Sequence, residues 1–115
     1  MKSILQDKRD RQCYICLHLH DRDCRYEDLH EHHIFYGFGN RKLSEKYGLK
    51  VMLCRYHHIG DIHGNMEAVH FGGRTEDVWL KRRAQMAWER RNTADPGTEE
   101  AHTQFREIFG KNYLD

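Results

Sequence analysis

The sequence of 115 residues contains no long apolar run, and hydrophobic side chains make up only 38% of it. A helix that crosses a bilayer needs about 20 predominantly apolar residues in succession. We therefore expect no membrane span. The first seven residues also lack the apolar segment of a secretory signal peptide. These two absences predict a cytoplasmic protein that does not bind a membrane.

The sequence has no large excess of charge of either sign. It carries 19 Lys and Arg against 18 Asp and Glu, a net charge of +1 with histidine neutral. Because no global basic field exists, any contact with nucleic acid must come from local patches such as Arg41 and Lys42 or residues 81–83. A chain of this length forms one domain, and a core this thin often needs a covalent or metal staple.

Four cysteines and ten histidines supply the means for such a staple. Cys13-x-x-Cys16 and Cys54-x-x-His57 are two half-sites of the spacing that lets two side chains face one zinc ion. Together they predict a closed, structural Cys₃His site. In a cytosolic protein this pattern favours metal over disulfides. The alternative is that the thiols are free and pack as small hydrophobic groups; for Cys24 we expect a free thiol.

Doubled histidines at positions 32–33 and 57–58 bound the central segment of the chain. A strand is predicted to end with Ile34–Tyr36, and a second, Val51–Leu53, to run into Cys54. Between them Leu43–Tyr47 predicts one helical turn closed by Gly48. This pattern brings imidazoles together from two strand ends.

Two helices are predicted in the C-terminal part. Leu80, Ala84, Ala87 and Trp88 form one apolar stripe, which predicts a helix over residues 76–91 with Thr75 as its N-cap. Asp95 and Pro96 are expected to start another helix as N-cap and first residue, and Gly110 to end it. The apolar face of that helix comprises Ala101, Phe105, Ile108 and Phe109.

Three motifs follow one another along the chain: Cys13-x-x-Cys16, then Glu31-His32-His33-Ile34, then Leu53-Cys54-x-x-His57-His58. In these motifs the chain resembles the HNH (His-Me finger, ββα-metal) endonucleases, most closely the small phage-type members with structural zinc. The resemblance extends over Glu31–His58 and Phe105–Leu114.

The resemblance implies a role for each histidine. His32 becomes a ligand of the catalytic metal, His33 the general base, and His58 a second ligand. A further ligand usually follows about four residues later, where this chain has Ile62. The resemblance favours His70 as the replacement, with His63 as the substitute. Asn40 is the nearest counterpart of the asparagine that braces the loop in this family.

The resemblance also implies the fold and the activity. The fold would be α+β, a small zinc-stapled ββα-metal core over residues 13–73, with an N-terminal arm over 1–12 and a C-terminal helical extension over 74–115. The activity would be metal-dependent hydrolysis of DNA phosphodiester bonds with low sequence specificity. Zn²⁺ would be structural, Mg²⁺ or Mn²⁺ catalytic, and the candidate phosphate contacts are Arg41, Lys42 and Lys46.

Two further expectations depend on this resemblance. Partners would be DNA and, for a phage protein, packaging or recombination proteins, in the cytoplasm of the host cell. The alternative function is a non-catalytic, zinc-stabilised module that binds nucleic acid or protein. Such a module would keep the Cys₃His site but would not need His32, His33 and His58 together.

Overall fold

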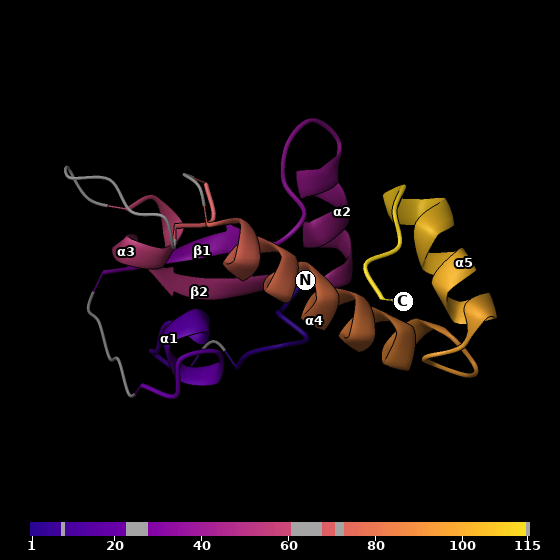
Figure 1. The fold of residues 1–115 in the computed structure, drawn as a ribbon, viewed down its shortest axis with the longest axis horizontal. Coiled ribbons are helices and arrows are strands. Elements are labelled where there is room, and N and C mark those ends of the chain that lie inside the picture. Colours follow the sequence, from indigo (N-terminus) through magenta and orange to yellow (C-terminus); the bar gives the residue numbers. More distant parts are fainter. Residues whose placement is uncertain (8, 23–27, 61–67, 71–72, 115) are drawn as a thin grey trace.

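The sheet at the centre of the fold has two antiparallel strands, β1 (Leu29–His33) and β2 (Lys50–Cys54). The computed structural model describes residues 1–7, 9–22, 28–60, 68–70 and 73–114. In the register of the pair, Leu29 lies opposite Cys54 and His33 opposite Lys50. Figure 1 shows the sheet with helices around it, a small α+β arrangement.

The first strand begins and ends earlier than the sequence predicted, because the backbone at Ile34 and Phe35 leaves the β2 ladder. The Ile34 amide donates to the carbonyl oxygen of Leu49 at 3.0 Å. The Phe35 amide donates to Ser44 Oγ at 2.9 Å, and the same hydroxyl donates to the Phe35 carbonyl oxygen. A buried serine on the next helix thus replaces the strand partner.

The connection between the strands is α2 (Asn40–Tyr47), which is longer than the single predicted turn. It ends as predicted at Gly48, whose φ of 70° is in the left-handed region. A side chain here would also collide with the backbone, because a Cβ on Gly48 would lie 2.3 Å from the carbonyl oxygen of Lys2. Two constraints therefore favour glycine at this position.

Each of the two ligand-x-x-ligand motifs leads into a short helix. Helix α1 (Tyr14–His18) follows Cys13, and α3 (Arg55–His58) follows Cys54 at the end of β2. Each cysteine has extended backbone and stands at the N-cap, so the next ligand of each motif lies one turn into a helix.

The C-terminal part contains α4 (Arg74–Asn92) and α5 (Glu99–Phe109). The predicted N-caps are wrong. Gly73 precedes α4 without a side-chain cap, and Thr98 caps α5 through a hydrogen bond from the Ala101 amide at 3.2 Å. Gly110, at φ 86°, ends α5 as predicted.

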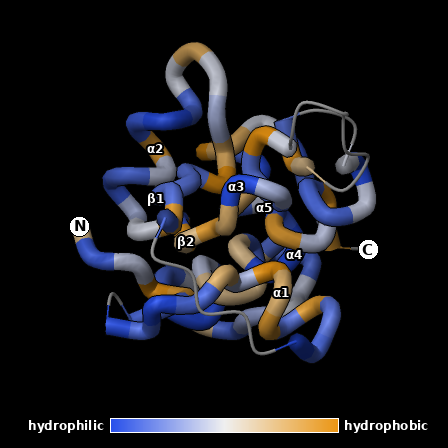
Figure 2. Tube along the Cα trace, turned by 90° about the vertical axis from the view of Figure 1, so that its left-hand side faces the viewer, coloured by the Kyte–Doolittle hydropathy of each residue, from blue (hydrophilic) through white to orange (hydrophobic). Residues whose placement is uncertain are grey.

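An aromatic cluster joins these helices to the segment that follows β1. The Phe105 ring stacks on Phe109 at 4.4 Å and contacts Phe35 at 5.7 Å and Trp88 at 5.5 Å. Ile108, predicted to lie on the apolar face, is 37% exposed. Figure 2 shows how hydrophobic segments gather inside, under a largely polar exterior.

The N-terminal residues lie along β2. The Ile4 amide donates to the Gly48 carbonyl oxygen at 2.9 Å, the Met52 amide donates to Gln6 Oε1 at 2.7 Å, and Ser3 Oγ donates to the carbonyl oxygen of Lys50. Backbone groups of β2 that β1 does not pair are satisfied in this way. The division into segments 1–12, 13–73 and 74–115 stays a prediction. Over the described residues, no helix combines the length and apolar character that crossing a bilayer requires.

Candidate metal centres

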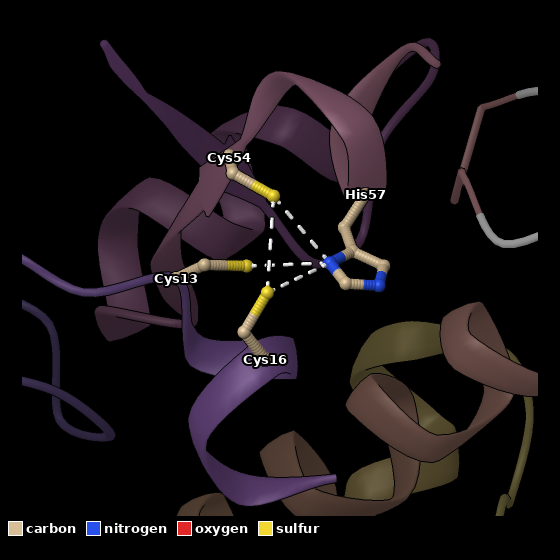
Figure 3. A group of neighbouring side chains, drawn as sticks. All are labelled: Cys13, Cys16, Cys54 and His57. Carbon is tan, nitrogen blue, oxygen red and sulfur yellow. Dashed lines mark hydrogen bonds between the residues drawn. The ribbon is translucent and has the colours of Figure 1, made fainter. Parts of the chain in front are cut away.

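The first candidate centre consists of Cys13, Cys16, Cys54 and His57, all four buried. Figure 3 shows the three sulfur atoms directed toward Nδ1 of His57. The Sγ atoms of Cys13, Cys16 and Cys54 lie 3.6, 3.3 and 3.4 Å from that nitrogen, and the Sγ atoms of Cys16 and Cys54 lie 4.0 Å apart.

These distances fit a tetrahedral zinc ion. Bonds of about 2.3 Å to sulfur and 2.0 Å to nitrogen require ligand separations of about 3.5 Å for sulfur to nitrogen and 3.8 Å for sulfur to sulfur. A set of three thiols and one imidazole is also the soft donor set that zinc prefers. The Cys₃His group could therefore hold a structural zinc ion.

The pKa values of two of the thiols are shifted by their contact with each other. A hydrogen bond from the Cys54 thiol, helped by His57, lowers the pKa of Cys13 against the opposing effect of burial. The same contact, together with burial, raises the pKa of Cys54. A bound cation would favour the thiolate form of all three sulfur atoms.

The second candidate centre consists of His32, His58 and His70, which the structure brings together from three separate segments. One ring nitrogen from each lies within 4.8 Å of the others. The three rings meet edge to face, with centroids 5.3 Å apart for His32 and His58, 5.1 Å for His32 and His70, and 4.8 Å for His58 and His70. This group could therefore hold a metal ion.

Two backbone hydrogen bonds fix the position of His70. The Val69 amide donates to the carbonyl oxygen of His57 at 2.9 Å, and the His70 amide donates to that of His58 at 3.3 Å. The segment therefore returns to α3 twelve residues after His58. His63, the substitute ligand, and Cys24 both lie outside the described residues.

The surroundings of these imidazoles lower their pKa values, although the side chain of His70 is exposed. Burial, reinforced by His70 and His58, lowers the pKa of His32 to about 3. Burial, then His70 and His30, lowers the pKa of His58 to about 4, and burial lowers the pKa of His70. Nε2 of His32, a side chain only 2% exposed, has no hydrogen-bond partner among the described residues. Neutral rings with a free lone pair suit a divalent cation.

His33 lies on the other face of β1. Side chains alternate along a strand, so His33 projects with Glu31, away from the face of His32. Its Nε2 lies 3.1 Å from Glu45 Oε1, and Lys50 Nζ contacts the same carboxylate at 2.8 Å. Glu31, His33 and Glu45 form a third group of possible ligands, and Lys50 already forms ion pairs with both of its carboxylates.

The predicted DNA-contacting residues lie on α2. Arg41, Lys42 and Lys46 are all exposed there. The Asn40 side chain donates to the Tyr36 carbonyl oxygen at 3.3 Å, a contact that spans the loop before α2. Phe38, at the tip of that loop, is fully exposed. The roles of these residues stay predictions.

Sequence reasoning missed two neighbours of the second centre. His30, two residues before His32, contacts His58, and the alternation of a strand could have indicated this. The Tyr36 ring packs on His70 at 4.6 Å, and its hydroxyl donates to the Val69 carbonyl oxygen at 3.4 Å. In sequence, Tyr36 gave no signal beyond its strand propensity.

Comparison with known proteins adds no assignment: no family model, no curated protein and no solved structure matches this chain. The interpretation of the two centres therefore rests on their own residues.

The zinc interpretation predicts a stoichiometry. The purified protein should contain one tightly bound zinc per chain at the Cys₃His site, and Cys13→Ala should lose it. We expect the melting temperature of that variant to fall by about 10 °C or more, since a structural zinc contributes at least several kcal/mol to folding. Elemental analysis and thermal denaturation measure both quantities. Cys24→Ala is the matched control and should keep the zinc; zinc retained by Cys13→Ala would refute the assignment.

The lowered pKa of His32 predicts acid destabilisation of the protein without metal at the three-histidine centre. Its folded-state pKa of about 3 lies below its usual value of 6.5. Below about pH 6.5 the unfolded chain therefore binds a proton that the folded chain does not. Stability should fall as the pH drops from about 6.5 toward about 3.

The variant His32→Leu removes this contribution. Urea unfolding between pH 5 and 8 should show the wild type losing stability relative to His32→Leu below about pH 6.5, with parallel curves above about pH 7.5. Parallel curves over the whole range would show that the His32 imidazole is not buried in its neutral form.

Proposed function

We propose that the protein is a metal-dependent endonuclease of the HNH type, which hydrolyses DNA phosphodiester bonds. The observation that carries the proposal is the convergence of His32, His58 and His70 beside the Cys₃His group. A zinc staple alone would need none of these three histidines.

The order of the elements supports the proposal. The first strand carries His32, the second strand ends in a cysteine of the Cys₃His group, and the short helix α3 carries His57 and His58 side by side. His57 faces the sulfur atoms, while His58 faces His32 and His70. Of these two adjacent residues, His57 would hold the structural zinc and His58 the catalytic metal, as the resemblance implies.

The donor set determines which metal fits. A divalent ion held by three imidazoles would supply Lewis-acid stabilisation of charge on the phosphoryl group and the leaving oxygen. Imidazole is softer than the oxygen ligands that Mg²⁺ prefers, so Mn²⁺, Co²⁺, Ni²⁺ or Zn²⁺ fits this centre better than Mg²⁺.

The general base must be supplied by the chain. For His33, Glu45 engages Nε2 at 3.1 Å, so the carboxylate holds the ring proton there and Nδ1 keeps its lone pair. The proposal therefore keeps Nδ1 of His33 as the proton acceptor, with Glu45 as its orienting partner, although its side chain leaves β1 on the face opposite His32.

DNA contact is assigned to α2 and the loop before it. With a net charge of +1 the chain has no general attraction for DNA. Exposed Arg41, Lys42 and Lys46 form a local basic patch, suited to phosphate contacts without base readout. The exposed ring of Phe38 adds a surface on which a base can stack.

A second candidate is the non-catalytic, zinc-stabilised binding module. The observation that favours it is the pairing of His33 with Glu45 on the face of β1 opposite His32. On this hypothesis His33 is a structural residue, and its removal would leave any DNA interaction unchanged.

A cleavage assay separates the two functions. Plasmid DNA is incubated with the zinc-loaded protein and Mn²⁺, Co²⁺ or Mg²⁺. We expect cleavage that depends on the added ion, and His33→Ala should cut about 100- to 10,000-fold more slowly, the range that a general base contributes. His32→Ala should lose cleavage because it removes a metal ligand.

Two controls make the result interpretable. His18→Ala changes an exposed histidine on α1 and should cut as the wild type does. The double variant Arg41→Ala, Lys42→Ala should keep its metals but bind DNA more weakly, which separates binding from chemistry. Absence of cleavage with every ion, or equal cleavage by His33→Ala, would leave the binding module as the function.

A further inference from the structure

His30 contacts the second centre without belonging to it. It lies on the same face of β1 as His32, two residues earlier, opposite Leu53 in the register. Its ring meets that of His58 at 5.0 Å and an interplanar angle of 78°. Yet His30 is not among the three histidines whose ligand atoms lie within 4.8 Å of one another.

The contact joins two identical atoms. Nδ1 of His30 and Nδ1 of His58 lie 2.9 Å apart, which is a hydrogen-bond distance. Between two neutral imidazoles, one nitrogen must donate and the other accept. Because Nδ1 of His58 is engaged with His30, metal binding by His58 in this arrangement would use Nε2.

Metal binding by His58 would fix the direction of this hydrogen bond. When Nε2 of His58 holds a cation, its Nδ1 keeps the ring proton and donates it, so Nδ1 of His30 accepts. Oδ1 of Asp28 lies 3.6 Å from Nε2 of His30, which is longer than a hydrogen bond.

We propose that His30 is a positioning residue that fixes the tautomer and ring orientation of His58 for a divalent metal ion. Metal-binding histidines generally donate their second ring nitrogen to an acceptor that orients them, and loss of that acceptor weakens metal binding. Here a second histidine fills the place of the usual carboxylate or carbonyl group. The inference rests on the proposed three-histidine metal centre but not on DNA cleavage.

The test measures metal affinity directly. Protein with zinc at the Cys₃His site is titrated with Co²⁺, and its visible absorption reports both affinity and coordination. His30→Ala should bind Co²⁺ about 10- to 100-fold more weakly, with the spectral shape unchanged. His30→Asn places an amide oxygen near the position of Nδ1 and should restore most of the affinity. His18→Ala should bind as the wild type does.

Each contrary result overturns the inference. Equal affinity in His30→Ala would show that His30 does not orient His58. A spectrum that loses a nitrogen ligand in His30→Ala would make His30 a direct ligand, and His30→Asn as weak as His30→Ala would exclude the acceptor role. Absence of Co²⁺ binding by the wild type would remove the centre itself. This test does not measure cleavage. A protein that shows these Co²⁺ affinities but does not cut DNA would contradict the proposed function and leave the role of His30 intact.

Discussion

The Cys₃His group is the constraint on which the rest of this structure depends. Cys13 and Cys16 come from α1, and Cys54 and His57 from the junction of β2 and α3, 38 residues beyond Cys16 along the chain. One shared cation at these four atoms would close a long loop and fix the end of the sheet. Because His57 and His58 are adjacent, the same constraint determines where the second centre can form.

The two ends of the molecule are stabilised differently. The aromatic cluster of Phe35, Trp88, Phe105 and Phe109 packs α4 and α5 against the segment that follows β1 by burial of apolar surface. At the other end, around α3, buried thiols and the buried rings of His32 and His57 lie beside apolar core side chains. Burial of groups that bind a cation costs stability unless the cation is present, so metal loading and folding are coupled at that end.

Local spacing in the sequence predicted the Cys₃His group, since ligand-x-x-ligand corresponds to an extended cysteine followed by one helical turn. His70 could be chosen only through the resemblance, because the hydrogen bonds that return residues 69–70 to α3 depend on tertiary contacts. Glycines at 48 and 110 were predictable as helix ends, whereas Thr98 as the cap of α5 was not distinguished from Asp95.

The face of His33 could not be read from the sequence. A doubled histidine suits a strand end or a bulge, where two neighbours can face one site. Instead β1 stays regular through His33, in register with Lys50, and alternation separates the pair. Strand β1 ends before Phe35 because the side chain of Ser44, and not a residue of β2, forms the hydrogen bonds of the Phe35 backbone. The start of the strand was also predicted too late, so His30 was placed before the strand, whereas it lies inside β1.

The most direct test of the account is anomalous diffraction from crystals of the zinc-loaded protein soaked in Mn²⁺. The account predicts zinc at Cys13, Cys16, Cys54 and His57, and a separate manganese ion with His32, His58 and His70 as its protein ligands. Manganese at Glu31, His33 and Glu45 instead, or no ion among the three histidines, would contradict it.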